Sequence, residues 1–112
     1  MGAMHVKIRK ALLAILIAVL AGGSTGCGFF IYSHRILKTN KAIAQAKVNK
    51  AEEYAPYEWT YAVEHAKKAK EEVAHSDYQA AIELAKDAEK KAVKAKEIAR
   101  KLKMEAGRET GE

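Results

Sequence analysis

The sequence has few of the residues that interrupt helices or cross-link chains. Its 112 residues include one Cys, one Pro and seven Gly, and no Gly lies between Gly28 and Gly107. A single Cys cannot form an internal disulfide, so Cys27 is an unmodified thiol, half of an intermolecular link or a modified residue. A long stretch without Gly that is rich in Ala and Lys is typical of long helices. These absences exclude a disulfide-stabilised domain and favour an all-α fold.

The chain also has few groups that could converge on a catalytic or metal site. No two of its four histidines have the i,i+3 or i,i+4 spacing that places two metal ligands on one helix face. These histidines are His5, His34, His65 and His75. The sequence has no Gly-rich phosphate-binding loop, and adjacent carboxylates on a helix point apart. We therefore expect no enzyme activity, no catalytic residue, no metal and no bound cofactor.

What the sequence does have is an amino terminus with the composition of an export signal. A basic stretch over Lys7, Arg9 and Lys10 precedes an uncharged run of eleven residues over 11–21. Small residues then lead to Cys27. This order is that of the n-region, h-region and cleavage region of a secretory signal.

The four residues Ser24, Thr25, Gly26 and Cys27 resemble the bacterial lipobox, in which small residues precede a Cys that receives the lipid. Ser24 departs from the Leu that is usual at the first place. The resemblance implies that Ser24, Thr25 and Gly26 are recognised by the signal peptidase. It also implies that the signal peptide 1–26 is removed and that Cys27 carries covalent lipid. Three acyl chains, at about 0.8 kcal/mol for each buried methylene, suffice for a stable anchor.

An uncleaved transmembrane helix over 11–32 is the alternative. No charge occurs in these 22 residues, which is about the length needed to cross a bilayer core at roughly 1.5 Å per residue. Gly22 and Gly26 could bring two such helices together. Both interpretations place the rest of the chain on the periplasmic or outer side of the membrane.

Two alanine-rich seams with heptad spacing follow. The first reads Ala55, Trp59, Ala62, Ala66, Ala69 and Val73, and the second Tyr78, Ala81, Ala85, Ala88, Ala92, Ala95, Ala99 and Leu102. A repeat of three and four residues sustained over several turns predicts packed helices. The short stretch between the seams predicts an antiparallel helical hairpin, which a third, earlier helix could extend to a three-helix bundle.

Boundary signals complete the predicted organisation. Ser76 with Gln79 is typical of a capping box at the start of the last helix, and Gly107 predicts its end. The earlier helix is expected to present Ala44, Val48 and Ala51 to the others. The predicted segments are a membrane-proximal tether at 27–35, a helical domain at 36–106 with helices at about 36–51, 56–74 and 77–105, and a flexible tail at 107–112.

The stretch from Ala51 to Ala99 resembles the short alanine-rich bacterial lipoproteins grouped as domain of unknown function 4398. The shared places are Ala55-Pro56, Ala62, Ala66, Ala69, Ser76-Asp77-Tyr78, Ala81, Ala85, Ala88 and Ala92. The family usually has Gly near the turn, where this chain has His75-Ser76. The resemblance implies a cell-envelope location and no particular activity.

Partners and location follow from the same features. Tyr57 and Tyr61, four residues apart, are either covered by the first helix or exposed as a docking patch for a protein or sugar. The alanine core predicts self-association or a protein partner. Acidic residues lie among the lysines along the chain, so we expect these lysines to form a solvated face, with contact to peptidoglycan or anionic lipid as the alternative. We expect no nucleic-acid partner, because a Lys/Ala-rich nucleic-acid binder would need an amino terminus that is neither signal nor anchor. Gly28 is not the Asp that resembles an inner-membrane retention signal, which favours an outer-membrane lipoprotein facing the periplasm.

Overall fold

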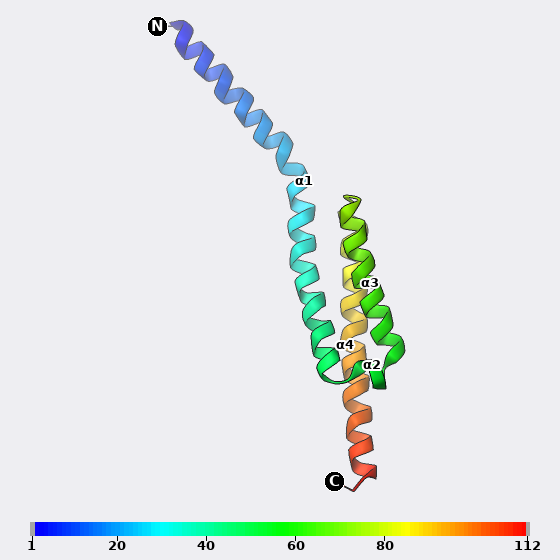
Figure 1. The fold of residues 1–112 in the computed structure, drawn as a ribbon. Helices are drawn as coiled ribbons and strands as arrows, with labels where there is room; N and C mark the ends of the chain where they lie inside the picture. The colour runs from blue at the N-terminus through cyan, green and yellow to red at the C-terminus, as the bar shows by residue number, and fades with distance from the viewer. Residues whose placement is uncertain (1, 112) are drawn as a thin grey trace.

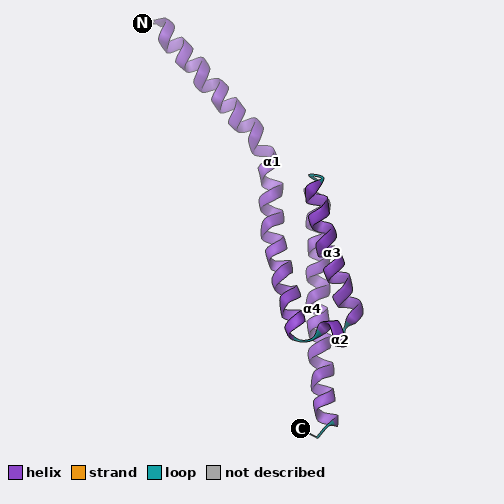
Figure 2. Ribbon diagram, viewed as in Figure 1, coloured by secondary structure: helices purple, strands orange, loops and turns teal. Residues whose placement is uncertain are grey.

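A computed structural model describes residues 2–111, and the side chains of all of these except residues 22–25. The side chains of Ser24 and Thr25, two of the predicted signal-peptidase residues, therefore lie outside the described part. The chain forms four helices, α1 (Gly2–Val48), α2 (Ala51–Tyr54), α3 (Pro56–Ala74) and α4 (Tyr78–Glu109). No strand occurs in residues 2–111 (Figure 2), which confirms the all-α prediction.

The second half of α1 and the helices α3 and α4 form a narrow bundle. Figure 1 shows α1 and α4 running in the same direction, with α3 antiparallel to both and α2 in the connection between α1 and α3. The first half of α1 leaves the bundle at an angle, and the last turns of α4 extend beyond the opposite end. The molecule is long and thin, with extents of 91 × 25 × 13 Å.

Alanine fills most of the space between the helices. The alanines of both predicted seams are buried, and those of α4 have no exposed surface at all: Ala81, Ala85, Ala88, Ala92, Ala95 and Ala99. Ala42 of α1, Ala62 of α3 and Ala92 of α4 meet in one cluster, so all three helices share this core. At one end of the α4 seam Tyr78 is half-buried against the core. At the other end Leu102 is exposed, because the last turns of α4 extend beyond the other helices.

Small side chains let α1 and α4 approach closely enough for a direct polar contact. Thr39 of α1 is fully buried, and its hydroxyl lies 2.8 Å from the carbonyl oxygen of Ala85 in α4 and 3.1 Å from that of Arg35. The hydroxyl donates to these carbonyls, so no unsatisfied polar group is left in the core. Arg35 also forms an ion pair with Glu89 of α4 at 3.1 Å.

The predicted tether at 27–35 is wrong, because α1 continues through it without a break. Residues 29–48 contain neither Gly nor Pro, and Tyr32 is buried between the other helices. Burial of the Tyr32 side chain stabilises the helix here, although the preceding residues 22–28 are rich in glycine, which disfavours a helix. The face predicted for the earlier helix is also largely wrong: Ala44 and Val48 are exposed, whereas Ala51 is buried in α2.

The helix ends differ from the predicted signals in detail. Asp77, not Ser76, caps α4: its carboxylate accepts a hydrogen bond of 3.0 Å from the Ala80 N–H. Ser76 instead adopts a left-handed conformation with φ 61° in the turn. The predicted tail at 107–112 is helical as far as Glu109, because Gly107 keeps a helical backbone; the left-handed backbone (φ 72°) comes four residues later, at Gly111.

A larger side chain at the three-helix cluster should be poorly tolerated. Ala92→Leu should lower the free energy of unfolding by about 1–3 kcal/mol, because the added atoms would have to separate the helices. Urea denaturation of the full chain in detergent, followed by circular dichroism, measures this. Ala44→Leu, the same change at an exposed position of α1, is the matched control, and equal stability of the two variants would contradict the packing described.

Candidate membrane-attachment site

The first half of α1 presents apolar side chains that contact no other helix. Large residues in this segment remain half or more exposed, namely Met4, Val6, Ile8, Leu12, Leu13, Ile15, Leu16, Ile17, Val19 and Leu20. A continuous apolar surface of this kind is unfavourable in water and marks contact with a membrane or a protein. By length and composition α1 can cross a membrane or act as an export signal. This segment is therefore the part of the chain suited to contact with a membrane.

Cys27 lies where this exposed segment meets the bundle, and its side chain is exposed. The next residue, Gly28, packs directly on α4: a Cβ at this position would lie 3.1 Å from the Cβ of Tyr78. The Phe29 ring then contacts the Tyr78 ring edge to face, with centroids 6.3 Å apart. The bundle therefore begins one residue after the predicted lipid-attachment site.

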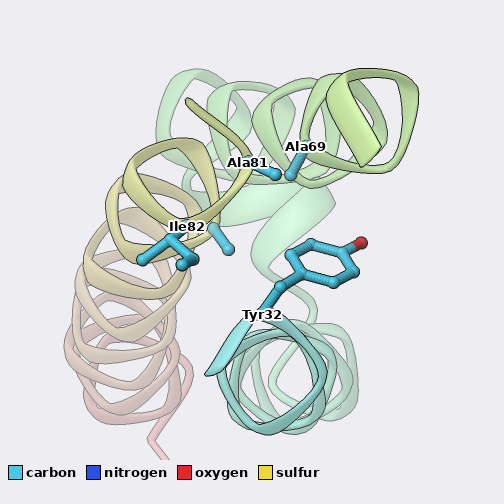
Figure 3. Packing of buried hydrophobic residues seen from close by; sticks show 5 residues of the cluster. Tyr32, Ala69, Ala81 and Ile82 are labelled. Carbon is cyan, nitrogen blue, oxygen red and sulfur yellow. The ribbon is translucent and has the colours of Figure 1, made fainter. Parts of the chain in front are cut away.

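Tyr32 lies in the core at the end of the bundle nearest Cys27. Figure 3 shows its ring reaching from α1 toward Ala69 of α3 and Ala81 of α4, and Ile82 of α4 belongs to the same cluster. Three exposed apolar residues, Phe29, Phe30 and Ile31, lie on the remaining surface of α1 beside it. This end of the bundle thus has an apolar interior and exposed apolar side chains on α1 next to Cys27.

Tyr57 and Tyr61, the predicted docking residues, lie together on the α3–α4 surface. Tyr57 is exposed and Tyr61 half-buried, so the first helix does not cover Tyr57. Lys91 of α4 places its ammonium 5.2 Å and 4.9 Å from the centroids of the two rings, and the Tyr61 ring stacks on His65 at 3.7 Å. These contacts order the two tyrosines within the fold, and whether they also bind a partner stays a prediction.

The histidines are spread over the fold. His65 Nδ1 lies 3.0 Å from the Tyr61 carbonyl oxygen one turn earlier, and His75 ends α3. Within the described residues, no group of three or more His, Cys, Asp or Glu side chains could hold a metal ion. The candidate site is therefore the apolar end around Cys27.

Comparison with known proteins finds no matching family model, no matching curated protein and no matching solved structure. The resemblance to the alanine-rich lipoproteins stays a prediction from the residues that carry it. The role of the site therefore depends on its geometry.

The contact at Gly28 makes a prediction about stability. Gly28→Ala should gain up to about 1 kcal/mol of helix propensity, yet crowding against Tyr78 should cost about 1–3 kcal/mol. We expect a net loss of about 1 kcal/mol in the free energy of unfolding of the full chain in detergent. Gly107→Ala, whose Cβ meets nothing within 4 Å, should not lower it, and equal stabilisation by both changes would show that α1 and α4 are not in contact at Gly28.

Proposed function

We propose that the chain is a non-enzymatic lipoprotein of the bacterial cell envelope, whose helical bundle is a spacer or adaptor held at the membrane by lipid on Cys27. One observation supports this most directly: no described side chain before Cys27 belongs to the hydrophobic core. The first buried residue of the chain's described part is Tyr32. Removal of residues 1–26 would therefore leave in place the core contacts that the structure describes.

The position of Cys27 suits a lipid anchor. Acyl chains on its exposed sulfur would enter the bilayer one residue away from the first contact between α1 and α4. Phe29, Phe30 and Ile31 are exposed at the same end, where apolar and aromatic side chains can enter the membrane interface. The bundle would then stand directly on the membrane surface.

The shape of α4 supports a spacer or adaptor role. Its 32 residues extend about 48 Å at 1.5 Å per residue, from the end near Cys27 to the far end of the molecule (Figure 1). The last turns, with Leu102 and Met104 exposed, extend beyond α1 and α3. A partner or a second copy could bind at this tip, about the length of α4 from the membrane.

The unbroken course of α1 favours a second candidate, a single-pass membrane protein with an uncleaved anchor. In this case the apolar half of α1 crosses the bilayer and the same helix continues into the bundle. The bundle and its distance from the membrane are nearly the same in the two candidates. The two candidates differ in whether residues 1–26 are removed and whether Cys27 carries lipid.

Intact mass spectrometry of protein extracted from bacterial membranes separates the two. We expect the mass to lack residues 1–26 and to include a diacylglyceryl group and an amide-linked acyl chain. Cys27→Ser should retain residues 1–26 without added mass. Ser24→Leu, which restores the usual lipobox residue, should be processed at least as fully as the unchanged chain.

Two results would contradict the proposal. An unmodified full-length mass in the membrane fraction would support the single-pass protein instead. An unmodified full-length chain in the cytosol would contradict both candidates.

A further inference from the structure

The second half of α1 has basic residues and no acidic ones. Between Cys27 and Lys50 the chain has five cationic side chains, and its first carboxylate is Glu52. The five are Arg35, Lys38, Lys41, Lys47 and Lys50. Every carboxylate that balances them in the bundle must therefore come from α2, α3 or α4.

Two hollows along the α1–α4 contact include two of these five, Arg35 and Lys41, and add four cations of α4. Together they form what we call the basic groove, lined by Arg35, Lys41, Ala44, Gln45, Val48 and Asn49 of α1 and by Lys86, Glu89, Lys90, Val93, Lys96 and Arg100 of α4. The Arg35–Glu89 ion pair and a 3.2 Å hydrogen bond from Lys96 to Gln45 connect its two walls. The groove thus follows the α1–α4 contact along the bundle.

The groove has a large excess of positive charge. Six of its lining residues are cationic and one, Glu89, is acidic. Glu89 is already paired with Arg35, and Lys86 pairs with Glu83 at 3.1 Å. In the part of the chain that the structure describes, no carboxylate forms an ion pair with the remaining four, Lys41, Lys90, Lys96 and Arg100.

This arrangement corrects the expectation that acidic residues disperse the positive charge. Along the chain Glu and Asp alternate with Lys, but the carboxylates of α4 mostly lie outside the groove. Glu97, for example, lines a neighbouring hollow on α4, which shares only Arg100 with the groove. Folding therefore gathers positive charge in the basic groove, although cationic and acidic residues alternate along the sequence.

The position of the groove and its exposed apolar side chains indicate a helical ligand. Helix α3 packs against one side of the α1–α4 pair, with Ala62 between Ala42 and Ala92, whereas none of the residues that line the basic groove comes from α3. Val48 and Val93, which lie among its charges, are 80% and 39% exposed. An amphipathic helix would cover these apolar side chains, as helix-in-groove ligands do, whereas a phosphate polymer would leave them in water.

We infer that the basic groove binds an acidic amphipathic helix of a partner protein, which would pack on α1 and α4 as a fourth helix of the bundle. Charge complementarity excludes the simplest self-pairing, because a symmetric contact between two copies would place the same cationic groove against itself. The inference does not depend on how the chain is anchored, because the groove lies entirely within the bundle.

The test uses the full chain in nanodiscs of neutral phosphatidylcholine, which removes anionic lipid as a competitor. The probe is a fluorescent helical peptide with Glu and Leu on one face and Gln elsewhere. A second peptide has the same composition and two central prolines, which prevent helix formation. Long-chain polyphosphate is the third ligand.

The helical peptide should bind more tightly than the peptide with prolines and than polyphosphate. Lys41→Gln, Lys96→Gln and Arg100→Gln together should weaken its binding about tenfold, since three charge contacts are lost. The matched control changes Lys67, Lys68 and Lys70 of α3 to Gln, with the same loss of charge, and should leave the affinity within about twofold. Val48→Asp, at an exposed position that should not affect folding, should weaken binding by repulsion.

Several results would overturn the inference. Equal effects of the two triple variants, or equal binding of the two peptides, would mean attraction to net charge alone. Tighter binding of polyphosphate that depends on Lys41, Lys96 and Arg100 would mean a site for a phosphate polymer. Absence of binding by the helical peptide would mean that the groove is a solvated surface.

Discussion

The close contact between α1 and α4 is the interaction on which the rest of the structure depends. It is close because the residues between the helices are small, and the 2.8 Å hydrogen bond from Thr39 to the Ala85 carbonyl shows how near the two backbones lie. Alanine buries little apolar area, so each contact contributes little by the hydrophobic effect. Stability must instead accumulate along the whole length of the seam, which explains why the bundle is long, thin and continuous.

The same contact determines how the apolar amino terminus is joined to the bundle. Because Gly28 and Tyr32 of α1 already pack against α4, no loop separates the exposed apolar segment from the folded part. Any anchor at or before Cys27 therefore holds the bundle against the membrane at one end. The far end of α4 is then directed away from the bilayer. The basic groove lies along the side of the bundle, between the anchored end and that far end.

The sequence predicted the parts of the fold that have one consistent pattern. The alanines of the α3 and α4 seams are buried, as their heptad spacing indicates. Helix α3 begins at Pro56, a residue suited to the first turn of a helix. The face of α1 could not be predicted in this way. Its alanines at 42, 44 and 46 fit several registers. The buried face is selected by Tyr32 and Thr39, which the alanine spacing does not include.

The sequence did not predict the capping residue of α4 correctly, because two neighbouring residues can both cap a helix. Ser76 and Asp77 are both good helix caps, and the turn geometry selects Asp77. Charge was equally hard to predict, because the face of α4 on which a Lys or Glu lies matters only once α1 has packed beside it. The residues that resemble a lipobox are different: their predicted role depends on recognition by another enzyme, so neither the fold nor the alanine seams test it.

Hydrogen exchange of the membrane-extracted protein, resolved by peptide, tests most directly whether α1 is part of the bundle. If it packs on α4 as described, the amides of residues 29–48 should be protected to the same degree as those in the middle of α4, since both open only when the bundle unfolds. Exchange of residues 29–48 within seconds, while α3 and α4 stay protected, would show a flexible connection to a two-helix hairpin and would contradict the account.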